Sequence, residues 1–169
     1  MAVKEIVLLG EPILRRVCQP ISEFGGNELQ LLNDLTDTLY AEPGRAGLAA
    51  PQIGIAIRMA VLDCDGELIE LINPVLLSSS GEQVGYEACL SIPEVFGQVT
   101  RAHSVKVQTL TRTGKEVVIE RQGFTAVCIL HELDHLDGKL FLDHVEQGYL
   151  FHELTGEELD VQEWIRRSK

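Results

Sequence analysis

Aromatic and basic residues are scarce in this sequence. Aromatics make up 5% of the 169 residues, and 14 Lys and Arg stand against 26 Asp and Glu, which gives a formal net charge of −12. The core must therefore depend on Leu, Ile and Val. The nearest approach to a basic cluster is the final segment 166–169, so DNA or RNA binding through a basic groove is not expected. The acidity is better explained as a solubilising surface.

Long apolar runs and paired cysteines are also absent from the sequence. No segment approaches the roughly 20 apolar residues of a membrane span, and the first five residues carry a Lys and a Glu rather than the apolar run of a secretory signal. We therefore expect no membrane attachment and a cytoplasmic location, where thiols stay reduced and free for metal binding or catalysis. No two of the four cysteines form a C-x-x-C pair; they are Cys18, Cys64, Cys89 and Cys128.

Patterns of apolar residues predict both helices and strands. Leucines at helical spacing predict an amphipathic helix over 27–40, with Asn27 and Gln30 as its capping box and Pro43-Gly44 as its end. The middle of the chain favours short strands, one pair of which is joined by a hairpin turn. We expect these strands, and one more near the N-terminus, at 5–9, 59–62, 68–72, 103–111 and 117–119.

Residues 124–136 are apolar on nearly every side and long enough for a helix, and a helix of that kind is buried. Asp137-Gly138 is a typical end for it. Thr155 and Glu158 predict a capping box that opens a short acidic C-terminal helix. We therefore expect one α+β domain over 1–169, in which antiparallel or mixed sheets pack around the buried helix, with one helix near each terminus.

The buried helix carries His131 and His135 four residues apart, with Glu132 between them. Positions i and i+4 of a helix share one face, about 6 Å apart along the axis, so both imidazoles can bind one metal ion beside a carboxylate that acts on water. A single buried His often serves only core hydrogen bonds. Two His and a Glu in one apolar helix are harder to explain that way, because burying an ionised Glu without a counter-charge is costly. A divalent cation would remove that cost.

A catalytic metal of this type needs a third protein ligand, a carboxylate or a thiolate, and keeps one position open. Cys89, in the segment 86–93, is a candidate, although a lone cysteine is more often a small core residue. A third segment, 44–54, is rich in Gly and Ala, which let the backbone approach a ligand closely. Its Gln52 is a neutral donor suited to a carbonyl oxygen, but by itself the segment is only a turn.

The three segments resemble those of the peptide deformylase family. The family motifs G-x-G-x-A-A-x-Q, E-G-C-L-S and H-E-x-D-H correspond, in this order, to residues 45–52, 87–91 and 131–135. The resemblance extends from near the N-terminus to about residue 144. It departs at Arg45 and Ala88, where the family usually has glycine. Ala88 would crowd the substrate or strain the backbone if its φ is positive.

The resemblance implies a metal-dependent hydrolase that removes the formyl group from the formyl-methionine of newly made polypeptides. Cys89, His131 and His135 would bind one divalent metal, iron(II) in the cell, with zinc, nickel or cobalt as substitutes. Glu132 would act as general base and then as general acid. The Gln52 amide and the Leu90 backbone N–H would stabilise the oxyanion.

The resemblance also implies substrate contacts and partners. The backbone near Gly47 would exclude acyl groups larger than formyl, and an apolar pocket would receive the methionine side chain. Core packing explains Val127 and Cys128 equally well. The partners would be N-formylmethionyl nascent chains, and the ribosome is a further candidate. The implied substrate contacts are Ala46, Gly47, Glu87, Val127 and Cys128.

Three alternatives stay open. In the family an Arg can pair with the Glu that opens the second motif, so Arg101 either supports Glu87 or is a solvated strand-end residue. The chain can also be a non-catalytic relative that binds formyl peptides without turnover. H-E-x-x-H serves other zinc peptidases too, with a downstream third ligand. The candidates for that ligand are His144, Glu146, His152 and Glu153.

Overall fold

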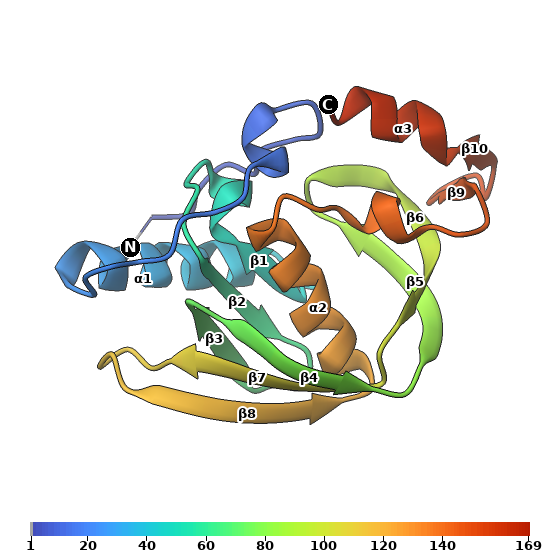
Figure 1. The fold of residues 1–169 in the computed structure, drawn as a ribbon. Helices are drawn as coiled ribbons and strands as arrows, with labels where there is room; N and C mark the ends of the chain where they lie inside the picture. Colours follow the sequence, from blue (N-terminus) through green and yellow to red (C-terminus); the bar gives the residue numbers. More distant parts are fainter. Residues whose placement is uncertain (1) are drawn as a thin grey trace.

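Three antiparallel sheets surround a central helix in the computed structural model, which describes residues 2–169 (Figure 1). The α+β prediction is confirmed. Three short 3-10 helices, η1 (Pro12–Arg15), η2 (Ala50–Ile53) and η3 (Phe141–His144), join the other elements. The α-helices and strands, in chain order, are α1 (Gly26–Tyr40), β1 (Gly47–Ala49), β2 (Met59–Asp63), β3 (Leu68–Ile72), β4 (Val75–Ser80), β5 (Gln83–Cys89), β6 (Ile92–Arg101), β7 (Ser104–Leu110), β8 (Glu116–Gln122), α2 (Phe124–Leu136), β9 (Tyr149–His152), β10 (Glu158–Asp160) and α3 (Val161–Arg167).

The sheets enclose α2 from several sides. Their strand orders are β1-β2-β3, β10-β9-β6-β5 and β4-β7-β8, and every pair of named strands is antiparallel. Helix α2 contacts β1, β2 and β8, whereas α1 packs on the β1–β2 side of the molecule. Within the described residues no helix has the length and apolar character that crossing a membrane requires.

Helix α2 has the bounds that the sequence predicts. Gly123 precedes it with φ 64°, and Gly138 follows its C-cap with φ 70°, a left-handed conformation that suits glycine. Ala126, Ile129 and Leu136 are fully buried and belong to one core cluster with residues of β2, β3 and β7. This packing fixes the helix, so its other face is held rigidly toward the site.

The N-terminal region differs from two predictions. Helix α1 begins at Gly26, one residue earlier than expected, so the third helical position is Glu28, whose Oε2 accepts the Gly25 N–H at 2.9 Å. The predicted Asn27–Gln30 capping box is therefore wrong. The expected strand at 5–9 is also wrong: Val7 N–H bonds to a carbonyl of η2 and Leu9 N–H to a carbonyl of the β5–β6 turn, so the segment pairs with no strand.

The C-terminal region differs as well. Residues 158–160 form β10, which pairs with β9, and β9 pairs with β6. Helix α3 begins only at Val161, where the Asp160 side chain accepts the Gln162 N–H at 2.9 Å. The predicted Thr155–Glu158 capping box is wrong because Thr155 lies in the hairpin loop, where its hydroxyl accepts from Glu157 N–H.

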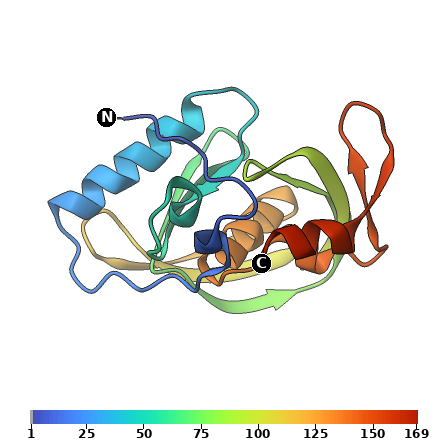
Figure 2. The ribbon, with the colours of Figure 1, turned by 90° about the horizontal axis from the view of Figure 1, so that it is seen from above.

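The C-terminal end of the chain meets the N-terminal segment at η1. The C-terminal end of α3 lies beside η1 (Figure 2). Arg15 of η1 donates to the Ser168 hydroxyl at 2.6 and 3.1 Å and forms an ion pair with Asp143. These contacts anchor the N-terminal segment just after residues 7 and 9 pass the site.

Gly138→Ala should destabilise the fold strongly. A Cβ at this position would lie 2.5 Å from the Arg15 carbonyl oxygen, and φ is +70°. We expect the free energy of unfolding to fall by about 3 kcal/mol or more, since the clash adds to the left-handed strain. Gly114→Ala is the matched control, because φ is +76° there but the added Cβ meets nothing within 4 Å. Urea unfolding that gives equal losses for both variants would contradict the clash.

Candidate active site

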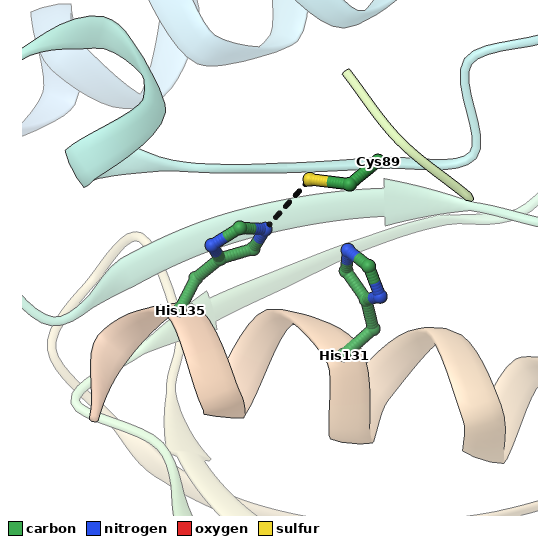
Figure 3. A group of neighbouring side chains, drawn as sticks. All are labelled: Cys89, His131 and His135. Atoms are coloured by element: carbon green, nitrogen blue, oxygen red, sulfur yellow. Dashed lines mark hydrogen bonds between the residues drawn. The ribbon is translucent and has the colours of Figure 1, made fainter. Parts of the chain in front are cut away.

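Cys89, His131 and His135 converge as the sequence predicts. One potential ligand atom from each lies within 4.8 Å of the others. Both imidazoles rise from α2 toward the thiol at the end of β5, and Cys89 Sγ is 3.3 Å from His135 Nε2 (Figure 3). The two rings are nearly perpendicular, with centroids 5.0 Å apart. The i, i+4 spacing on helix α2 supplies two potential metal ligands, and strand β5 supplies the third.

Strand alternation explains how Cys89 reaches the helix. Glu87 and Cys89 are two residues apart on β5, so both point to the buried face, whereas Tyr86 and Ala88 are exposed. The ladder with β6 shifts register between Ala88 and Cys89. Such a bulge bends a strand and changes the direction of a side chain. The E-x-C spacing thus places a carboxylate and a thiolate side by side.

A charged network holds this arrangement in place. Arg101 is buried and donates to both oxygens of Glu87, at 2.8 and 3.0 Å, and to Asp134 Oδ2 at 2.6 Å. Glu87 Oε2 lies 3.1 Å from His131 Nδ1, which leaves the other ring nitrogen to face the cluster. The interpretation of Arg101 as a solvated residue is therefore wrong. A carboxylate on the outer nitrogen of a ligating His fixes its ring and raises its basicity.

The surroundings of Cys89 and Glu87 favour their ionised forms. Burial raises the pKa of the Cys89 thiol, but the adjacent His135 and His131 outweigh it and lower that pKa to about 5. Burial likewise opposes ionisation of Glu87, yet His131 and Arg101 hold its pKa at about 2. A thiolate and two imidazoles form a donor set that suits a divalent transition metal. The residues present therefore fit a catalytic metal.

Glu132 is buried beside the cluster without a counter-charge of its own. It is 3% exposed, its Oε2 has no hydrogen-bond partner among the described residues, and burial raises its pKa to about 7. A Cβ built on Gly47 would lie 2.9 Å from Glu132 Cδ and closer still to Oε1. Only glycine at position 47 leaves room for this carboxylate.

Gln52 lies on η2 with its amide fixed. Its Oε1 accepts the Ala49 N–H at 2.9 Å, and its Nε2 lies 3.2 Å from Ser91 Oγ and 3.5 Å from Cys89 Sγ. An amide nitrogen is thus directed at the metal-ligand cluster, as a donor to an oxyanion would be.

A cavity of about 520 Å³ opens over these groups. Its lining includes every substrate contact implied by the sequence, together with Gln52, Leu90 and Glu132. The sequence suggested Glu153 only as a metal ligand of another peptidase and not as a residue of this cavity, because it comes from the unpredicted β9–β10 hairpin. Phe124 and Tyr86 could have been found as aromatics beside the motifs. The lining residues that sequence reasoning missed are Gly44, Tyr86, Pro93, Glu94, Phe124 and Glu153.

The candidate ligands of another zinc peptidase stay apart from the cluster. Among the described residues, the potential metal-binding group consists of Cys89, His131 and His135 alone. His144 Nε2 instead lies 2.9 Å from Asp134 Oδ2. His152 Nδ1 accepts the Leu154 N–H at 3.2 Å.

Comparison with known proteins agrees with this geometry. The family model described as polypeptide deformylase matches residues 3–149. The chain belongs to this family. A curated relative, the peptide deformylase of Carboxydothermus hydrogenoformans, is 47% identical over 146 residues, which cover 86% of this chain and 95% of the relative.

Solved deformylases share the fold. The crystal structure of peptide deformylase from Thermotoga maritima is similar with a TM-score of 0.83 and 34% identity, covering 86% of this chain and 99% of that one. The Met-Ala-Ser-bound crystal structure of class I type b peptide deformylase from Acinetobacter baumannii gives a TM-score of 0.81 at 35% identity and covers 85% and 99%. The chain is a metal-dependent hydrolase that removes formyl groups from nascent peptides, and neither alternative activity finds support.

The two departures from the deformylase motifs are accommodated. Ala88 is exposed on the outer face of β5, and it is not among the residues with positive φ, so the strain considered for it does not arise. Arg45 donates to the Thr38 carbonyl at 2.6 Å and pairs with Glu42 at 3.2 Å. Both line the cavity, and neither is one of the three potential metal ligands.

Gly47→Ala should impair catalysis more than folding. The new methyl group would displace the flexible Glu132 carboxylate, while φ at this position carries no left-handed strain. We expect kcat to fall about 10²-fold with metal content unchanged and the free energy of unfolding within about 1 kcal/mol of wild type. Gly85→Ala, on β5 with open space around its Cβ, is the control. Equal kcat values for the two variants would show that Glu132 does not need this space.

Arg101→Ala should weaken metal binding. It leaves Glu87 buried without its cation, so the carboxylate no longer holds His131 in one orientation. We expect metal affinity, measured by chelator competition, to fall about 10- to 100-fold. Arg121→Ala removes a comparable ion pair with Glu67 on the surface and should leave the affinity unchanged. Unchanged affinity in Arg101→Ala would limit Arg101 to a packing role.

Proposed function

We propose that residues 1–169 act as one domain that hydrolyses the N-formyl group of formyl-methionyl polypeptides at the cluster of Cys89, His131 and His135. One observation carries the proposal: three potential metal ligands converge beside a buried carboxylate and an oriented amide, and all of these residues except His135 line one cavity. No other arrangement of side chains in the described part of the chain brings these chemical roles together.

We propose iron(II) as the metal in the cell, with zinc, nickel or cobalt able to replace it in purified protein. Cys89, His131 and His135 would hold it through one sulfur and two ring nitrogens. When bound, the metal supplies a Lewis acid that polarises the formyl carbonyl and acidifies water. One thiolate in the donor set leaves a milder Lewis acid than three neutral imidazoles would.

Glu132 supplies the proton transfer. Because burial holds its pKa at about 7, the carboxylate can accept a proton from the attacking water and later return it to the leaving amine. The Gln52 amide and the Leu90 N–H are the proposed donors to the oxyanion of the tetrahedral intermediate. Fixed donors of this kind stabilise developing charge without reorganisation.

The cavity explains the substrate class. A Gly at 47 lets the backbone and Glu132 approach the formyl carbon, which carries hydrogen where other amides carry carbon, so larger acyl groups would clash. We propose that the methionine side chain lies against Val127 and Cys128, which line the same cavity. The similarity to the Met-Ala-Ser-bound relative supports a peptide that continues past methionine.

The biological partners follow from this substrate. We propose that the enzyme works in the cytoplasm, where polypeptides are synthesised, and that its partner is the nascent chain itself. The ribosome is the remaining candidate partner. A net charge of −12 makes ribosomal RNA an unfavourable docking surface.

Turnover of formyl-Met-Ala-Ser by iron-, nickel- or cobalt-loaded protein tests the function, and two variants separate its parts. Glu132→Gln should keep the metal but lose about 10²- to 10⁴-fold in kcat, because it removes the base and not a donor. Cys89→Ser should lose metal affinity as well as activity. Formate release and metal analysis give both readouts.

Absence of turnover with every metal would refute the proposed function. Full metal retention by Cys89→Ser would refute the ligand set instead. The two failures are therefore distinguishable.

A further inference from the structure

Ser91 contacts the proposed oxyanion donor but has no assigned role. It is fully buried in the turn between β5 and β6, and its Oγ accepts a hydrogen bond from Gln52 Nε2 at 3.2 Å. The residue directly before it, Leu90, supplies the second proposed oxyanion donor. Ser91 therefore links the two segments that form the oxyanion site.

The hydrogen bonds of Gln52 determine which way its amide points. A carboxamide has one acceptor oxygen and two N–H donors, and it can rotate by half a turn. The Ala49 N–H requires the oxygen on one side, and Ser91 Oγ accepts one of the two N–H groups on the other. The second N–H stays on the side of Cys89 Sγ, 3.5 Å away, where the reacting group would be.

The N-terminal segment holds the backbones of both Gln52 and Ser91. Val7 N–H donates to the Gln52 carbonyl and Leu9 N–H to the Ser91 carbonyl, each at 2.8 Å. Leu9 packs against a buried core cluster, as do Trp164 and Ile165 of α3. The distance between Gln52 and Ser91 is therefore set by the fold and not by their side chains alone.

We propose that Ser91 is a positioning residue that aligns the Gln52 amide for the transition state. The proposal rests on the proposed role of Gln52 as an oxyanion donor. Ser91 acts through Gln52, so its removal should affect the chemical step and not the binding of a peptide that has no formyl oxygen. A serine that served only packing would lower stability without this selectivity.

A double-mutant cycle between Ser91→Ala and Gln52→Ala tests the proposal. We expect kcat to fall about tenfold in Ser91→Ala and about 10²-fold in Gln52→Ala. The double variant should resemble Gln52→Ala, since Ser91 has nothing left to position. Metal content and the dissociation constant of the product Met-Ala-Ser should stay at wild-type values in Ser91→Ala. Independent, multiplying losses near 10³-fold, or weakened product binding, would overturn the proposal.

Two further variants control for folding. Ser168→Ala removes another buried serine hydroxyl, far from the site, that accepts from Arg15; it should lower the melting temperature but not kcat. Ser91→Thr keeps a hydroxyl and should retain more of kcat than Ser91→Ala. Equal losses in Ser91→Thr and Ser91→Ala would overturn the proposal. An unchanged kcat in Gln52→Ala would refute the proposed role of Gln52 itself. That result is distinguishable from one that refutes only the positioning role of Ser91.

Discussion

Burial of charge around helix α2 is the constraint on which the rest of the structure depends. One face of the helix is part of the apolar core, and the other carries two imidazoles and the carboxylate of Glu132. His131 and Glu132 line the cavity. Ions buried in this way are tolerated only when they are paired or bound to a cation. Arg101 compensates Glu87 and Asp134, while the metal-ligand cluster is left for a divalent metal. Charge balance therefore dictates what surrounds the polar face of the helix.

The sheets meet this constraint by supplying groups at fixed spacing. Alternation along β5 directs Glu87 and Cys89 to α2, one toward the outer nitrogen of His131 and the other toward His135. Arg101 comes from the far end of β6 and pairs with Glu87 across the hairpin. A two-stranded ladder can hold three charged or ligating groups against one helix because its register is fixed by the backbone. The metal site thus follows from one helix and one hairpin.

Local patterns in the sequence predicted what depends on neighbours along the chain. Helix α2 has the predicted bounds because its apolar run and the Gly at 138 act within a few residues. The proposed ligands Cys89, His131 and His135 were indicated by two motifs, each of which lies within a few residues of the chain. The β9–β10 hairpin and the Glu28 cap were missed: β9 is held by its pairing with β6, a contact between distant segments, and α1 starts one residue earlier than its leucine pattern suggests. The Arg101 network stayed open for the same reason, since Asp134 is 33 residues away.

The exact positions of the site's side chains depend on backbone N–H groups, which no sequence motif identifies. Gln52 and Ser91 are fixed by backbone N–H groups of Ala49, Val7 and Leu9, and every residue except proline carries such a group. A motif therefore identifies which side chains do the chemistry, but their placement within a fraction of an ångström depends on the path of the flanking chain. The N-terminal segment forms no strand because its hydrogen bonds go to η2 and to the β5–β6 turn, which carry the proposed oxyanion donors. The same hydrogen bonds that keep this segment from pairing as a strand also hold Gln52 and Ser91 in place.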